Sequence, residues 1–447
     1  MGSGEAAPAR EPAPVPAPEP APATLPDGAS SHGAGQSDDR PRTLLITIVV
    51  LALIMNTIAR GVTETFAVFL LAVQDGLDAS RGEITAAYSL YMVVLGISAP
   101  AAGQLVDRAG VRLTYGFGLV TLGGGYALAG FAETLVQYYL CVGLLGGLGG
   151  AAIGMVVASS LLSRWFTGRV GLIMAIPYAA VGLGMLVVPW VTQALLQVYG
   201  WRTVYMMLGV GTLAMFPLTM ALPLSRMSRG SRSWRALRQR ARAQAGGWQV
   251  SAAVRTGGFW GLFAAYFFTS VSAYAVLPQS VAYLQEAGFD PLIAAGAFGF
   301  TGALSVVGIL SIGWLADAIG RKLALTLSYA MSITGIILLM AIATYPTLAL
   351  VYGFVACFGL MQGARGPVIL SYVTLLFPGG SVGAIFGTLS LALGLGAGSG
   401  SYLSGLLVEW TGAYTASFAL GATASLLGLA MFLMVPALRR ERALVRS

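Results

Sequence analysis

Charged residues are scarce in this chain. They make up 9% of its 447 residues, whereas an average soluble protein has about 25%. So few charges leave too little polar surface for a soluble protein of this size, which excludes that class. Hydrophobic residues make up 57%, and apolar stretches of about 20 residues, the length of a transmembrane helix, recur along the chain. The sequence predicts an all-α protein that crosses a membrane many times.

Histidine and cysteine are nearly absent. The only histidine, His32, lies in a polar segment near the N-terminus, which excludes a histidine proton relay or metal site from the apolar part. Cys141 and Cys357 fall in separate apolar stretches, which argues against a disulfide framework. The glycine-rich stretch around Gly150 lacks the Gly-Lys-Ser/Thr of a phosphate loop. We therefore expect no cofactor, no metal site and no enzymatic activity, with a gradient as the energy source.

Twelve stretches have the length and composition of membrane spans. Between the sixth and the seventh lies a basic linker, 225–256, which holds no Asp or Glu and separates two six-span bundles, 43–224 and 257–437. Residues 1–42 are rich in Pro and Ala and predict a disordered tail, and 438–447 form a second tail. The predicted spans are 43–72, 86–105, 112–132, 135–161, 168–197, 202–224, 257–285, 291–316, 321–344, 347–376, 380–408 and 413–437.

The basic residues predict how the chain is oriented. An even number of spans places both termini on one side. Most Arg residues then fall in the tails, the linker and the loops of that same side, whereas only Arg81 and Arg202 fall on the opposite side. Cytoplasmic loops are enriched in Lys and Arg, so we expect both termini in the cytoplasm. The excess positive charge thus fits membrane topology and predicts no nucleic-acid partner.

One loop motif occurs twice, once in each half. Gly-Gln-Leu-Val-Asp-Arg-Ala-Gly at 103–110 precedes the third span, and Gly-Trp-Leu-Ala-Asp-Ala-Ile-Gly-Arg-Lys at 313–322 precedes the ninth. At these residues the chain resembles the major facilitator superfamily over 43–437. The resemblance implies two pseudo-symmetric six-helix bundles, alternating access and a gating role for both loops. The residues that would hold helix ends together and release them are Asp107, Arg108, Arg112, Asp317, Arg321 and Lys322.

Further motifs resemble bacterial monocarboxylate-transporter-like and oxalate/formate-antiporter-like permeases. They include Phe-Ala-Val-Phe-Leu at 66–70, Ser-Arg-Gly-Glu-Ile at 80–84, Tyr-Gly-Trp-Arg at 199–202 and Ala-Arg-Gly-Pro at 364–367. The chain departs from these permeases at two places: 305–309 has no Asp–Arg pair, and 383–407 has no Lys.

Three ionisable residues remain deep inside the predicted spans: Arg60 and Glu64 in the first, and Arg365 in the tenth. An Arg at the centre of a membrane helix costs about 2.5–3.5 kcal/mol, so each needs a partner, water or a ligand. The family resemblance implies that spans 1, 4, 7 and 10 line a central cavity. That placement puts one Arg of each half where a planar guanidinium can bind a carboxylate.

Structural roles are the alternatives for these charges. Glu64 follows Arg60 by four residues on one helix face, so the two can form a fixed ion pair. Glu64 is then a counter-ion, or else it carries the proton of a proton-coupled transporter. Arg365 can instead contact backbone carbonyls near Pro367. The polar residues predicted to complete the substrate site are Tyr266, Tyr274, Gln279 and Gln362.

The function predicted from these features is secondary active transport of a small organic anion, most consistent with a monocarboxylate, by proton symport or exchange. The protein would lie in the bacterial inner membrane with the lipid bilayer, the anion and protons as partners, and a monomer would suffice. The alternatives are a carrier of a drug, vitamin or other metabolite, and a transporter-like sensor.

Overall fold

The computed structural model describes residues 42–166, 170–228, 230–231, 248–378 and 382–439. The predicted tails and most of the basic linker lie outside these residues. Most of the described part of the chain is helical, and no strand occurs there. Ten of its helices are long and apolar enough to cross a membrane. The predicted all-α membrane fold is confirmed.

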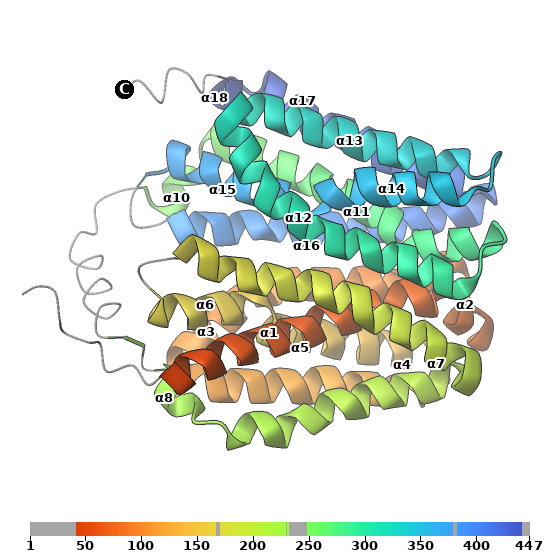
Figure 1. Ribbon diagram of the computed structural model, residues 1–447, viewed down its shortest axis with the longest axis horizontal. Coiled ribbons are helices and arrows are strands. Elements are labelled where there is room, and N and C mark those ends of the chain that lie inside the picture. Colours follow the sequence, from red (N-terminus) through yellow and green to blue (C-terminus); the bar gives the residue numbers. More distant parts are fainter. Residues whose placement is uncertain (1–41, 167–169, 229, 232–247, 379–381, 440–447) are drawn as a thin grey trace, which may run out of the picture. The chain divides into compact units, whose positions relative to one another are not determined.

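The long helices lie side by side along one axis (Figure 1). In this figure α1–α8 lie below α10–α18; we call these two sets the N-terminal half and the C-terminal half. Their bounds are α1 Arg42–Glu64, α2 Phe66–Gly76, α3 Arg81–Ala129, α4 Leu135–Tyr138, the π-helix η1 Tyr139–Leu145, α5 Gly146–Ile153, α6 Met155–Trp165, α7 Val170–Ala221, α8 Leu224–Ser228, α10 Val250–Ala253, α11 Gly257–Glu286, α12 Pro291–Ile319, α13 Arg321–Ala341, α14 Leu348–Gln362, α15 Arg365–Leu376, α16 Val382–Thr411, α17 Tyr414–Met434 and α18 Pro436–Arg439.

The two longest elements each contain a sharp break at a glycine. Gly110 in α3 has φ +84° and ψ 168°, and Gly200 in α7 has φ +72° and ψ 161°. Only glycine adopts this backbone region readily, so both glycines let the chain turn back on itself. Each of α3 and α7 is therefore a pair of helices joined end to end. The count of twelve spans stays a prediction.

Short interruptions divide three of the spans near their middles. Thr65 separates α1 from α2, Gly154 separates α5 from α6, and Gly363 and Ala364 separate α14 from α15. Such breaks are tolerated in a membrane where neighbouring helices or water satisfy the freed backbone groups. The ionisable residues Glu64 and Arg365 flank two of the breaks.

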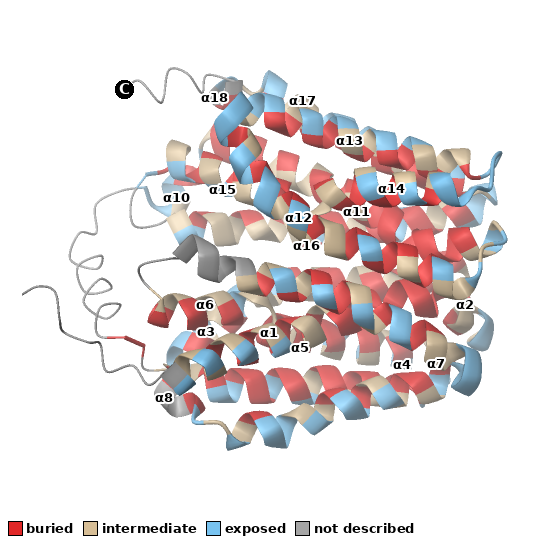
Figure 2. Ribbon diagram, viewed as in Figure 1, coloured by how far each residue is buried: buried red, intermediate tan, exposed pale blue. Residues whose placement is uncertain are grey.

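The halves pack against each other along two seams, α3 against α16 and α7 against α12. The first seam is close because small residues face each other: a Cβ on Gly394 would lie 2.7 Å from the Cα of Gly96. Buried residues concentrate between the helices (Figure 2). Large apolar side chains such as Trp314, 72% exposed, lie on the outside, as a lipid-facing surface requires.

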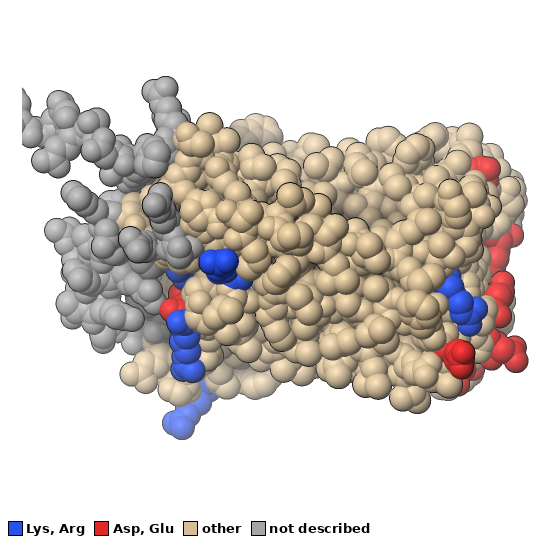
Figure 3. Space-filling view, turned by 90° about the horizontal axis from the view of Figure 1, so that it is seen from below, with Lys and Arg blue, Asp and Glu red and all other residues tan. Residues whose placement is uncertain are grey.

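The two ends of the bundle differ in charge. One end, which we call the acidic end, carries Asp75, Asp78, Glu83, Glu133, Glu286, Asp290 and Glu409 at helix ends and in the turns between helices. Figure 3 shows carboxylates gathered at one end of the molecule and most of the visible Lys and Arg side chains at the other. The opposite end, which we call the basic end, carries Arg108, Arg112, Arg164, Arg321 and Lys322.

Candidate substrate site and gating loop

An ion pair occupies the middle of α1. The Nη2 atom of Arg60 lies 2.6 Å from Oε1 of Glu64, one helical turn further on. The two side chains differ in exposure: Arg60 is 24% exposed and Glu64 is 2% exposed. The pairing expected from the four-residue spacing is therefore present, and the guanidinium is its accessible member.

Tyrosines from other helices complete this group. The same Nη2 of Arg60 donates to the hydroxyl of Tyr274 at 2.9 Å, which joins α1 of one half to α11 of the other. Tyr88 of α3 donates to Oε2 of Glu64 at 3.4 Å, and its ring lies 6.2 Å from that of Tyr274. We call Arg60, Glu64, Tyr88 and Tyr274 the Arg60 cluster. Sequence reasoning missed Tyr88.

The Arg60 cluster has an unused donor. Nε of Arg60 is buried and has no hydrogen-bond partner among the described residues. A guanidinium binds a carboxylate through two parallel N–H donors. The Arg60 side chain as a whole is 24% exposed, while its Nη2 is bound to Glu64 and Tyr274.

Arg365 lies in a different group. Its Nε donates to Oγ of Ser328 at 2.9 Å, and its Nη2 donates to the Ser328 carbonyl at 2.8 Å and to Oγ of Ser332 at 2.5 Å. The guanidinium lies 4.1 Å from the ring centroid of Tyr329, and the residue is 3% exposed. Arg365 thus contacts α13, and its carbonyl partner is Ser328 rather than one near Pro367. Its role in substrate binding stays a prediction.

The other predicted polar residues are spread over the bundle. Half-buried Tyr266 stacks on Phe386 of α16 with ring centroids 6.3 Å apart. Gln362, at the end of α14, has a buried Oε1 without a partner in the described ranges. Gln279 is fully buried and accepts from Arg81 at 3.3 Å. Among the described residues, Arg60 and Tyr274 are the two predicted substrate residues joined by a hydrogen bond.

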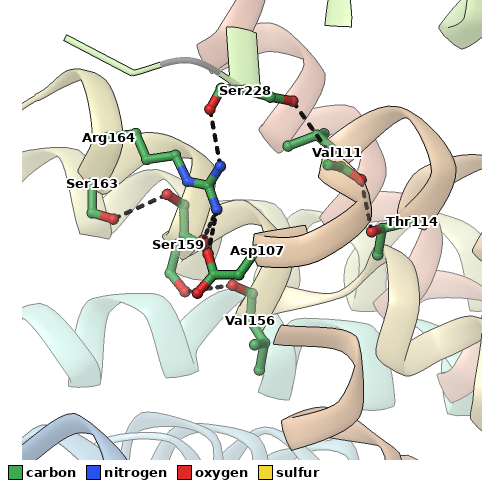
Figure 4. Close-up of polar contacts among 10 residues, drawn as sticks. Asp107, Val111, Thr114, Val156, Ser159, Ser163, Arg164 and Ser228 are labelled. Atoms are coloured by element: carbon green, nitrogen blue, oxygen red, sulfur yellow. Dashed lines mark hydrogen bonds and ion pairs between the residues drawn. The ribbon is translucent and has the colours of Figure 1, made fainter. Parts of the chain in front are cut away.

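Asp107 of the first predicted gating loop pairs with Arg164, at the end of α6 (Figure 4). Nη2 of Arg164 donates to Oδ1 of Asp107 at 2.7 Å, and Nη1 donates to the Ser228 carbonyl at 3.0 Å. Oγ of Ser228 in turn accepts from the backbone N–H of Val111 at 3.2 Å. These contacts connect α3, α6 and α8 at the basic end, all within the N-terminal half. Sequence reasoning missed Arg164, although its position at the end of an apolar stretch was visible.

The remaining residues of the two loops lie at the surface of the basic end. Arg108 and Arg112 are exposed, and Nη2 of Arg112 lies 3.5 Å from the Met220 carbonyl. In the second loop Asp317 and Lys322 are exposed and Arg321 is half-buried. Their gating role stays a prediction.

These features define a multi-pass membrane protein with charged residues between its halves, and comparison with known proteins gives its family. The family model of the Major Facilitator Superfamily matches residues 49–364 and 306–446. The chain belongs to the Major Facilitator Superfamily, as the loop motifs indicated, and is a transporter of that superfamily.

Relatives and solved structures agree with this assignment. The chain is 28% identical to monocarboxylate transporter 13 of Bos taurus over 393 residues, 87% of this chain and 88% of that protein. It is 26% identical to the oxalate:formate antiporter of Oxalobacter formigenes over 309 residues, 67% of this chain and 69% of that protein. Its fold resembles the crystal structure of a D-xylose-proton symporter, with a TM-score of 0.67, 14% identity, and coverage of 88% of this chain and 98% of that one.

Proposed function

We propose that this protein carries a small organic anion, a monocarboxylate, across the bacterial inner membrane by alternating access. The observation that carries the proposal is the Arg60 guanidinium, which is partly accessible, has an unused Nε donor and lies between the two halves. The names of two relatives, a monocarboxylate transporter and an oxalate:formate antiporter, support a carboxylate as cargo.

In the proposed mechanism the carboxylate binds the fork of Arg60. Tyr274 also contacts this guanidinium and belongs to the C-terminal half, so a bound anion would touch both halves at once. A ligand that contacts both halves can favour one arrangement of the halves over another by its different contacts in each. Glu64 keeps the guanidinium charged and oriented while the site is empty.

Glu64 can also couple the transport of the anion to that of a proton. When the anion takes up positive charge from Arg60, the buried Glu64 carboxylate loses part of its compensation, which favours its protonation. Proton symport follows if that proton travels with the anion, and exchange follows if a second anion resets the site instead. We propose that Tyr266, Gln362 and Arg365 contribute from the C-terminal half. Arg365 can do so only after releasing its hydrogen bonds to α13.

We further propose that the basic end faces the cytoplasm. The excess of Lys and Arg at the basic end supports this orientation, because cytoplasmic loops are enriched in basic residues. Both termini then lie in the cytoplasm.

Uptake by proteoliposomes containing the purified protein tests the function. The panel should hold labelled monocarboxylates and dicarboxylates, each paired with its uncharged amide, with and without a pH gradient and with and without internal anion. We expect uptake of a carboxylate and no uptake of its amide, driven by the pH gradient or by internal anion. Transport of amides and carboxylates alike would contradict an anion carrier.

A further inference from the structure

Arg81 reaches from one half of the molecule into the other. It is the first residue of α3, and its side chain is 9% exposed. Nη2 lies 2.8 Å from Oε1 of Glu286 at the end of α11. Nη1 donates to the Tyr414 hydroxyl at 3.0 Å and to Oε1 of Gln279 at 3.3 Å. One cation of the N-terminal half therefore binds three residues of the C-terminal half.

A second carboxylate of the C-terminal half reaches the same helix end. Oε2 of Glu409 accepts from the backbone N–H of Gly82 at 2.9 Å. This N–H belongs to the first turn of α3, where N–H groups lack partners in the helix and a negative charge is favourable. A Cβ on Gly82 would lie 2.7 Å from that same oxygen, so a side chain at this position would have to displace it. Ser80 and Glu83 form a capping box that fixes this helix start.

The seam below these contacts is tightly packed. Oγ of Ser89 on α3 donates to the Gly398 carbonyl on α16 at 2.7 Å. The side chain of Thr85 fills the space over Gly405, where no Cβ could fit. In the part of the chain that the structure describes, the side-chain hydrogen bonds between the halves run from the Arg60–Tyr274 contact toward the acidic end. The halves are thus closed together at the acidic end.

Some buried polar groups in this closed interface lack a hydrogen-bond partner in the described part of the chain. Nε of Arg81 and Nε2 of Gln279 are buried without a hydrogen-bond partner among the described residues. Polar groups held away from water without partners disfavour the state that buries them. Water could reach both groups if the seam opened. The interface thus combines strong hydrogen bonds with buried groups that lack partners within the described ranges. This combination favours an interface that opens and closes over one that only stabilises the fold.

We propose that the Arg81–Glu286 ion pair and the Glu409–Gly82 hydrogen bond hold a gate closed at the acidic end. We call these two contacts the latch. Breaking the Arg81–Glu286 and Glu409–Gly82 contacts separates α3 from α16 and exposes the Arg60 cluster to the acidic side. The latch rests on the proposed alternating access, but it specifies neither the substrate nor the coupling ion.

Distances between spin labels test the latch without any substrate. Asp75 and Ile293 are exposed at the acidic end, one in each half, and each would carry a label on cysteine in a Cys141→Ala, Cys357→Ala background reconstituted in nanodiscs. We expect Arg81→Gln to raise the population with the longer distance at least threefold. Glu286→Gln, which changes a half-exposed side chain, should act in the same direction and serves if Arg81→Gln does not fold.

Two further variants separate a latch from a general loss of structure. Arg202 also lies at the acidic end but contacts Ala132 and Trp201 of its own half, so Arg202→Gln should leave the distances unchanged. The exchange of charges in Arg81→Glu with Glu286→Arg should return the distribution toward that of the parent. Unchanged distances in folded Arg81→Gln and Glu286→Gln, or no recovery in the exchanged pair, would overturn the proposal. Failure of carboxylate uptake would affect the proposed function and leave these distances as they are.

Discussion

At the scale of single residues, the Arg60–Glu64 pair combines a structural and a functional demand. Glu64 is 2% exposed and needs a compensating charge, whereas Arg60 reaches an accessible position with a donor to spare. Buried ion pairs add little net stability, but removing one partner leaves an uncompensated charge. Substitution of Arg60 alone should therefore lower the free energy of unfolding more than substitution of Arg60 and Glu64 together.

We expect Arg60→Ala to destabilise the fold by about 3–5 kcal/mol, because it leaves Glu64 buried without its partner. Adding Glu64→Gln should recover a large part of that loss, since the neutral side chain no longer needs a counter-ion. Thermal or denaturant unfolding of the single and double variants in one detergent gives the comparison. Equal stability of Arg60→Ala and the double variant would show that the pair does not compensate a buried charge.

The Arg60–Glu64 contact could be predicted from the sequence, whereas the contacts around it could not. The four-residue spacing of Arg60 and Glu64 in an apolar stretch predicted their contact, because both lie on one helix face. Tyr88 comes from another span, and no local pattern reveals a contact that packing creates. Arg365 was harder still: its partners Ser328 and Ser332 carry no charge and look like ordinary residues of an apolar helix. Gln279 shares a helix with Tyr274, yet its contact is Arg81.

At the scale of elements, glycines shape the helices by two different means. Gly110 and Gly200 supply a backbone conformation, whereas Gly96 and Gly394 supply room for close contact between α3 and α16. The Gly-rich loop motifs predicted where the chain turns between spans. They did not predict the α3–α16 seam, because closeness between helices far apart in sequence depends on how the halves pack.

Gly200→Ala should destabilise the protein through its backbone alone. No atom lies within 4 Å of a Cβ at this position, and the conformation at φ +72° and ψ 161° costs a residue with a side chain of the order of 1–3 kcal/mol. Gly211 is the matched control, since it lies in the same element, also has open space and is helical. Gly211→Ala should be neutral or slightly stabilising. Equal effects of Gly200→Ala and Gly211→Ala on the unfolding temperature would contradict this explanation.

We expect the loop that contains Asp107 to affect the transport rate. Asp107 is 46% exposed and its pair with Arg164 is worth little in stability, yet it connects α3 to α6 near α8. We expect Asp107→Asn to lower the transport rate with little change in substrate affinity or unfolding temperature. Binding and transport should be measured on one preparation. A large loss of affinity at normal turnover would assign Asp107 to the substrate site instead.

At the scale of the whole molecule, charge separates along the bundle while the interior stays nearly free of it. The fold class, the family and the loop motifs were all predictable from the sequence, since low charge, apolar periodicity and repeated motifs are properties of the chain itself. The closed arrangement of the halves at the acidic end was not predictable, because it depends on contacts between residues 198 and 205 positions apart.

The orientation of the bundle can be tested directly. Lys322 is exposed at the basic end and Asp75 at the acidic end. A membrane-impermeant thiol reagent added to intact cells should label Asp75→Cys and leave Lys322→Cys unlabelled until the cells are opened. Labelling of Lys322→Cys from outside would reverse the proposed topology.

The most direct measurement is the binding of a transported carboxylate and of its uncharged amide to wild type, Arg60→Lys and the double variant Arg60→Gln with Glu64→Gln. The double variant removes the guanidinium without leaving Glu64 unpaired. Wild type should bind the carboxylate at least tenfold more tightly than the amide, Arg60→Lys should keep part of that preference because it retains the charge but not the fork, and the double variant should lose it. If the double variant folds and still prefers the carboxylate tenfold, Arg60 is not the anion-binding residue.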